Sequence, residues 1–148
     1  MQVSFKYNEP EGFTTNVDGK SQINIKNSIT NNTRNFAPTE LLLLGIGGCT
    51  SDDVLSILRK MKQNVVEYQC EINAEREEEI PKTLKKANIH YKFQGDLDPE
   101  KVRKAINLSL VKYCSVSIIV KRGGAKVTYS FSINGQEYDK EQAPELTE

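Results

Sequence analysis

The chain has 148 residues, with 20 basic and 20 acidic side chains and a formal net charge of zero. This length suits one domain with a sizeable core, and the balanced charge does not favour a nucleic-acid or acidic-membrane surface. The N-terminus shows no secretory signal, and the strongly apolar run over residues 41–46 is far shorter than the ~20 residues of a membrane span.

The cysteines set the expected compartment and chemistry. Three cysteines without CxxC spacing and a single histidine favour neither a disulfide framework nor a zinc site. We therefore expect a cytoplasmic protein with free or redox-active thiols.

The first residues predict an antiparallel meander. Apolar and polar residues alternate over 3–7, 13–17 and 23–25, and Asp18-Gly19 is typical of a hairpin turn. Three strands alone cannot close a core, so we expect this sheet to pack against the next element.

A polar loop over residues 27–35 follows and contains Arg34. A cation close to a thiol would lower the pKa of that thiol. Most arginines are solvated, so the residue alone favours an exposed loop side chain.

Residues 38–61 predict one long helix. Pro38 suits the first turn, and Glu40 suits the positive end of the helix dipole. Three glycines within four positions then interrupt an apolar run. Each costs a helix roughly 1 kcal/mol relative to alanine, so we expect another part of the chain to approach closely there.

Cys49 follows these glycines, where the helix changes from apolar all round to amphipathic. A helical wheel places Asp52 and Asp53 on its side and the core residues opposite. Such a thiol is sheltered yet reachable, as a reactive cysteine requires. Free cysteine is also a common core residue, and this stretch alone favours that simpler interpretation.

The next two segments predict strands. Residues 66–74 alternate as a half-buried strand, with Cys70 on the core face as a structural cysteine. Residues 87–93 alternate in the same way and place His90 on the solvated face.

A second helix is expected from Asp98-Pro99, a good N-cap followed by a first-turn proline, to near Cys114. Strands are predicted over 116–120 and 127–133, with a glycine turn between them.

This element order predicts an α+β domain over residues 1–136. Its N-terminal antiparallel meander and C-terminal sheet frame two helices. The polar, acidic residues 137–148 are interpreted as a frayed tail. The glycines in the long helix do not follow a strand, so they do not form a phosphate-binding loop.

The stretch PTELLLLGIGGC at residues 38–49, with KYCSV at 112–116, resembles the OsmC/Ohr family of thiol peroxidases, and the element order matches over nearly the whole chain. The resemblance implies an OsmC-like α+β fold in an intertwined homodimer. It implies Cys49 as the peroxidatic and Cys114 as the resolving cysteine, joined by a disulfide during turnover. It also implies organic hydroperoxides or hydrogen peroxide as substrates and a dithiol reductant, either a small thiol or a lipoyl-type protein, without a metal or cofactor.

Two positions depart from that pattern. The family glutamate ten residues before the first cysteine is Thr39 here, and Glu40 lies one residue later, ~100° around a helix. Arg34 resembles the family arginine that holds the thiolate, but the connection from it to Pro38 is shorter than in the family. Asp52 and Asp53 lie one turn from the first cysteine, and a nearby carboxylate disfavours a thiolate.

Three interpretations follow for the thiols. The first is a cysteine-based peroxidase in which Cys49 attacks, Cys114 resolves and Arg34 stabilises the thiolate. The second is a redox sensor, or a binder of a small apolar ligand, without enzymatic activity. The third is a structural cysteine pair in a dimer.

Overall fold

In the computed structural model, which describes residues 1–147, the chain divides into two compact units. The N-terminal unit is Met1–Leu44, and the second unit begins at Gly45. The boundary falls inside the long helix α1 (Pro38–Lys60). Each unit is described by itself below.

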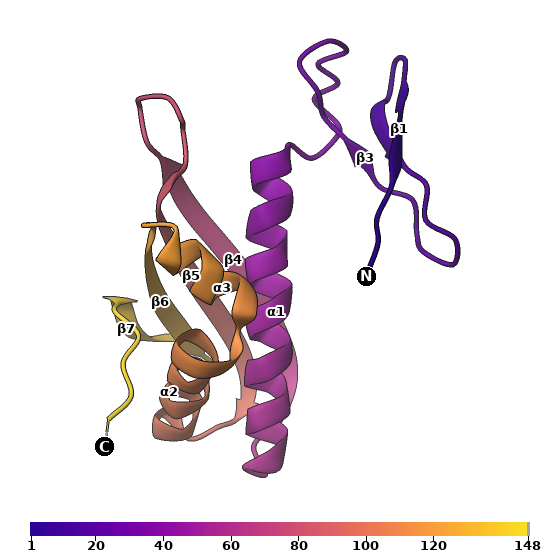
Figure 1. Ribbon diagram of the computed structural model, residues 1–148. Helices are drawn as coiled ribbons and strands as arrows, with labels where there is room; N and C mark the ends of the chain where they lie inside the picture. The colour runs from indigo at the N-terminus through magenta and orange to yellow at the C-terminus, as the bar shows by residue number, and fades with distance from the viewer. Residues whose placement is uncertain (148) are drawn as a thin grey trace. The chain divides into compact units, whose positions relative to one another are not determined.

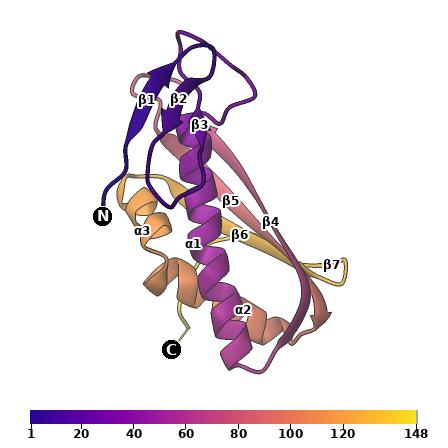
Figure 2. The same ribbon diagram turned by 90° about the vertical axis from the view of Figure 1, so that its right-hand side faces the viewer.

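The N-terminal unit contains the predicted antiparallel meander. Its strands are β1 (Phe5–Asn8), β2 (Gly12–Thr15) and β3 (Asn24–Ile25), hydrogen-bonded in that order. Figure 1 labels β1 and β3, and Figure 2 labels all three strands. Gly12 has φ +104°, and a Cβ there would lie 2.7 Å from the Ile25 carbonyl oxygen, so only glycine fits. The strands are short and many of their apolar side chains are exposed, so this sheet encloses little core of its own.

Helix α1 spans the 23 residues Pro38–Lys60, as the sequence predicted. The Glu40 carboxylate accepts the backbone N–H of Ala37 at 2.7 Å, which caps the first turn. By length and composition α1 could cross a membrane, because an 18-residue window of the helix has a mean hydropathy of 1.6. The strongly apolar run Leu41–Ile46, which the sequence analysis considered, is by itself too short to span a membrane. Core helices of water-soluble proteins also meet this criterion.

The second unit is built on a four-stranded sheet. Its strands are β4 (Asn64–Arg76), β5 (Leu84–Asp96), β6 (Lys126–Ile133) and β7 (Gln136–Gln142), in that spatial order. The β5–β6 pair is parallel, and the β4–β5 and β6–β7 pairs are antiparallel. The remainder of α1 from Gly45 and the helices of the β5–β6 crossover cover one face of this sheet (Figure 2).

The crossover between the parallel strands consists of α2 (Pro99–Leu108), a π-helical turn (Ser109–Tyr113) and α3 (Ser115–Arg122). The strand predicted over residues 116–120 is therefore wrong. A parallel pair needs a crossover, and the chain uses these residues for its last helix. Alternation of Val116, Ile118 and Val120 over so short a segment does not separate a strand from a helix.

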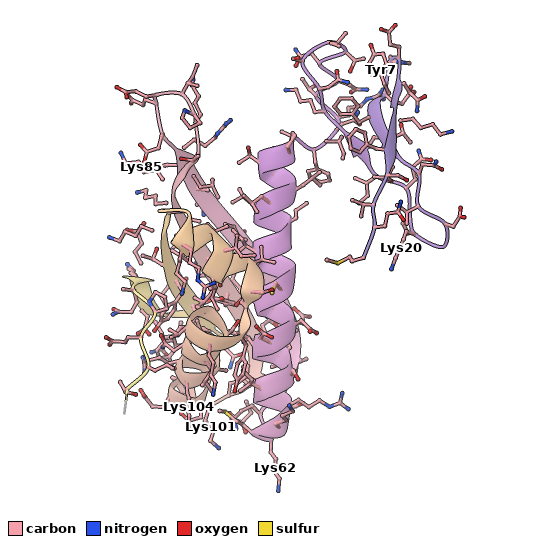
Figure 3. All side chains as sticks on the ribbon, viewed as in Figure 1. Tyr7, Lys20, Lys62, Lys85, Lys101 and Lys104 are labelled. Carbon is pink, nitrogen blue, oxygen red and sulfur yellow. The ribbon has the colours of Figure 1, made fainter. Side chains whose placement is uncertain are left out.

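Helix α2 begins at Pro99, as predicted, and is amphipathic. Val102, Ala105 and Ile106 are fully buried, while the labelled side chains of Lys101 and Lys104 extend outward (Figure 3). Its N-cap is Asp98, whose carboxylate accepts the Glu100 N–H at 2.9 Å.

Residues 137–142, interpreted from sequence as part of a frayed tail, form most of β7. The Tyr138 ring stacks on Phe131, with centroids 5.2 Å apart, and Asp139 pairs with Arg103 at 2.7 Å. These two anchors are isolated in a polar segment, so composition did not reveal them. His90, predicted to be solvated, is half-buried with its Nε2 3.3 Å from the Glu137 carboxylate.

Strand β4 is half-buried as predicted, with one exception at its start. The sequence placed Val66 on the core face, yet its side chain is 68% exposed. The register with β5 shifts between Val65 and Glu67, so Val66 is the extra residue of a β-bulge. Cys70 follows the regular alternation and is half-buried.

Candidate thiol site

The second unit brings Cys49 and Cys114 together. The two sulfur atoms and a carboxylate oxygen of Asp53 all lie within 4.8 Å of one another. Cys49 is half-exposed, whereas Cys114 is fully buried. Asp53 lies one helical turn after Cys49 on α1, on the side that the helical wheel predicted. The site is therefore a reachable thiol, a sheltered thiol and a carboxylate in one place.

Cys114 occupies the junction between the π-helical turn and α3. It is the N-cap of α3, and its sulfur accepts the Ser117 backbone N–H at 3.4 Å. Burial raises the pKa of the Cys114 thiol, the hydrogen bonds from Ser117 oppose that rise, and the neighbouring Cys49 adds to it. Cys114 consequently keeps its proton at neutral pH.

Lys121 is a cation near the buried thiol that the sequence did not indicate. Its ammonium group donates to the Leu110 carbonyl oxygen, in the π-helical turn. Burial lowers the pKa of Lys121, and the Coulombic effect of Cys114 partly restores it. The sequence analysis missed this residue because α3 was predicted to be a strand, on which the two positions would not come together.

A chain of buried hydroxyl groups leads to the carboxylate. The Tyr91 hydroxyl lies 2.7 Å from Thr50 Oγ1, and Thr50 Oγ1 lies 2.8 Å from Ser109 Oγ. Ser109 donates to Asp53 Oδ2 at 2.9 Å. Each hydroxyl carries one proton, so Ser109 must accept from Thr50, and Thr50 must accept from Tyr91. This hydroxyl relay holds the Asp53 carboxylate beside the two sulfurs.

The relay is anchored in the core. The relay consists of three fully buried residues, Tyr91, Thr50 and Ser109. Burial raises the pKa of Tyr91 well above its ordinary value, so its hydroxyl remains a donor. From the sequence, Tyr91 lies within the alternating strand predicted over residues 87–93 and Ser109 lies within the predicted second helix, and neither was given a role. The sequence did contain a hint of the relay, because Tyr91 and Ser109 each bring a hydroxyl group to a core position. A buried hydroxyl group needs a hydrogen-bond partner.

The other predicted site residues lie in the N-terminal unit. Arg34 is exposed, and its backbone N–H donates to Asn32 Oδ1 at 3.2 Å. Thr39 is half-buried in the first turn of α1, and the Glu40 carboxylate caps that turn. The cap gives Glu40 a local structural role. Participation of Arg34, Thr39 or Glu40 in thiol chemistry stays a prediction.

The third cysteine has a different environment, which we call the Cys70 cluster (Ser51, Tyr68 and Cys70). The hydroxyls of Ser51 and Tyr68 lie 2.7 Å apart. Burial raises the pKa of Cys70, and the two hydroxyls oppose that rise. Cys70 is not part of the group formed by Cys49, Asp53 and Cys114. This agrees with its predicted structural role.

Comparison with known proteins connects this geometry to a family. A model of the family described as OsmC-like protein matches residues 11–130. Protein YhfA of Escherichia coli (strain K12) is 37% identical over 98 residues, which are 66% of this chain and 72% of that protein.

Solved structures share the fold. A hypothetical protein from Aquifex aeolicus VF5 superimposes with a TM-score of 0.79 at 27% identity, covering 90% of this chain and 95% of that one. An OsmC-like protein from Mycoplasma pneumoniae gives 0.76 at 14% identity, covering 89% and 95%. A Legionella pneumophila organic hydroperoxide resistance protein OsmC gives 0.67 at 15% identity, covering 89% and 97%. The last two identities establish the α+β fold alone.

Proposed function

This chain belongs to the OsmC-like family, and we propose that it is a thiol-dependent peroxidase reducing organic hydroperoxides or hydrogen peroxide. The observation that carries the proposal is the distance of no more than 4.8 Å between the Cys49 and Cys114 sulfurs. A disulfide needs about 2.05 Å between sulfurs, so a small adjustment closes the pair. The Legionella neighbour, an organic hydroperoxide resistance protein, supports the substrate class.

The reaction needs only the two thiols and the peroxide. The Cys49 sulfur attacks the terminal peroxide oxygen, the O–O bond breaks, and the thiol and hydroperoxide become a sulfenic acid and an alcohol. The Cys114 thiol then displaces the sulfenic hydroxyl as water and forms the Cys49–Cys114 disulfide. A dithiol donor, either a small thiol or a lipoyl-type protein, restores both thiols by exchange.

The surroundings of the two sulfurs support this division of roles. Cys49 is half-exposed, so it is the sulfur that a peroxide reaches. Cys114 is buried and protonated, so it waits until the sulfenic acid forms beside it. Lys121 lies where its charge favours the Cys114 thiolate in the resolving step. We retain Arg34 as the proposed cation for Cys49, with Thr39 and Glu40 as secondary positions.

We further propose that the protein works as a homodimer in the cytoplasm. In the N-terminal unit Phe5 is 57% exposed, Ile29 74% and Phe36 49%. A second copy of the chain would bury such side chains. Three free cysteines fit a reducing compartment.

The test follows the thiols directly. The reduced protein receives one equivalent of an organic hydroperoxide, and free thiols, intact mass and cross-linked peptides are measured. Loss of two thiols with a Cys49–Cys114 link is expected. In Cys114→Ser the reaction should stop at a Cys49 sulfenic acid, while Cys70→Ser should behave as the wild type. Two unreacted thiols in the wild type would exclude the proposal.

The sensing interpretation has one specific observation in its favour, the Asp53 carboxylate beside both sulfurs. A carboxylate disfavours a neighbouring thiolate and would slow the first step. The rate separates the two functions. A disulfide that forms quickly and turns over with a dithiol donor supports the peroxidase, whereas slow, stoichiometric oxidation supports a sensor.

A further inference from the structure

Cys49, Asp53 and Cys114 offer three donor atoms from separate positions of the fold. The two sulfurs and the carboxylate oxygen converge within 4.8 Å of one another, so a single ion can contact all three after small shifts. Two sulfurs bound to a tetrahedral Zn²⁺ at about 2.3 Å lie roughly 3.8 Å apart, which is inside that limit. Cys49 and Asp53 come from adjacent turns of α1, and Cys114 comes from the start of α3.

The donor types select the class of ion. Thiolates favour soft or borderline metals, and one carboxylate with two sulfurs is a ligand set that Zn²⁺ and Cd²⁺ accept. Mg²⁺ and Ca²⁺ require oxygen ligands, so two sulfurs discriminate against them. Three protein ligands leave a fourth position for water.

Groups behind the donors already hold them in place. Ser109 donates to Asp53 Oδ2 at 2.9 Å, and Ser109 is itself fixed by Thr50. The Ser117 N–H donates to the Cys114 sulfur at 3.4 Å. Such partners orient metal ligands and raise affinity, because less ordering remains to be done when the ion arrives. The half-exposed Cys49 provides the side from which an ion enters.

We propose that the reduced protein binds one Zn²⁺ or Cd²⁺ ion through Cys49, Asp53 and Cys114. Binding replaces the two thiol protons with two metal–sulfur bonds and releases those protons. The carboxylate adds one metal–oxygen bond, and no electron is transferred. The site exists only while the two cysteines are reduced. The inference rests on the geometry of the donors and does not require the peroxidase function.

The site has a consequence for the thiols. Sulfur lone pairs engaged by the metal are less available to attack a peroxide, so the bound ion shields the thiol pair from oxidation. Removal of the ion by a chelator restores two free thiols.

The test titrates the fully reduced full-length chain anaerobically with Cd²⁺, whose thiolate complexes absorb in the ultraviolet, and with Zn²⁺ by calorimetry against a competing chelator. One equivalent and an absorbance for two thiolates are expected. Cys49→Ser and Cys114→Ser should each halve the absorbance. Asp53→Asn should weaken binding at least about tenfold while keeping the Ser109 hydrogen bond.

Cys70→Ser is the matched control, since it removes a thiol outside the group, and it should bind as the wild type does. Thermal melts of each variant without metal confirm folding. The proposal is overturned by no binding, by binding that survives Cys49→Ser unchanged, or by an Asp53→Asn affinity equal to that of the wild type. None of these readouts uses a peroxide, so failure here is distinguishable from failure of the proposed function.

Discussion

Neighbouring positions of α1 face two different thiol environments. Cys49 adjoins Cys114 and Asp53, with Thr50 in the relay behind them. Ser51 faces Tyr68 in the Cys70 cluster. Burial raises the pKa of Cys114 and of Cys70 alike, so a raised pKa does not distinguish these two environments. They differ in that Cys114 has a second sulfur within 4.8 Å.

The largest contrast is expected in activity. Cys49→Ser should lower the rate of hydroperoxide consumption more than 100-fold, because sulfur is the attacking atom. Cys70→Ser should change it less than about twofold, because Cys70 lies outside the thiol pair. The measurement is peroxide consumption with excess dithiol. Equal losses in the two variants would contradict the contrast.

The hydroxyl groups of Tyr91 and Tyr68 should differ in how much they contribute to the stability of the fold. Tyr91→Phe removes the first donor of a fully buried relay and leaves Thr50 short of a partner, at a cost of about 1–3 kcal/mol. Tyr68→Phe removes a hydrogen bond from a half-buried group and should cost about 0.5–1.5 kcal/mol. Denaturant unfolding of both variants provides the comparison. A larger loss for Tyr68→Phe would show that the relay is not the tighter network.

The pH dependence of stability should reflect both the buried Cys114 thiol and the half-buried Cys70 thiol. A raised pKa means that the folded state holds the thiol proton more tightly than the unfolded chain does. The resulting stabilisation is fully present below the ordinary thiol pKa of about 8.5 and is lost as the pH rises towards the raised value.

We therefore expect the free energy of unfolding to fall above about pH 8.5, and Cys114→Ser and Cys70→Ser each to flatten that fall. The free energy of unfolding is measured by reversible denaturant unfolding from pH 7 to 10 under reducing conditions. A wild-type profile that stays level over this range would contradict the shifted pKa values.

The smallest effects should come from the glycines of α1. A Cβ on Gly48 would meet nothing within 4 Å, so Gly48→Ala should stabilise the fold by about 0.5–1 kcal/mol. A Cβ on Gly47 would lie 3.1 Å from Ile72 Cδ1 and 3.9 Å from the Cys70 sulfur. Gly47→Ala should therefore gain less or lose stability, because Ile72 must shift.

Thermal unfolding of both alanine variants tests this difference in packing. A clear loss in Gly48→Ala would contradict the open space at this position and would indicate that another surface covers the face beside Cys49 in solution. In that case the open space at Gly48 belongs only to the isolated chain.

The contribution of the sequence differs between elements. Long periodic segments such as α1 and β5 were predicted correctly, because their patterns run over many residues. The segment 116–120 was not, because a few alternating residues fit a strand or a helix equally. Strand β7 was missed because Tyr138 and Asp139 gain their partners from β6 and α2.

The sequence by itself determined the family and the long cysteine-bearing helix, and it singled out Cys49 and Cys114 as a candidate pair, since these depend on local pattern and motif. Only the tertiary structure decided that Asp53 joins both sulfurs, that Tyr91, Thr50 and Ser109 form a relay to it, and that Lys121 lies near Cys114. These groups are dozens of residues apart along the chain or on an element whose type was ambiguous. Their contacts arise because buried hydroxyls and thiols must find partners when the crossover packs against α1 and the sheet.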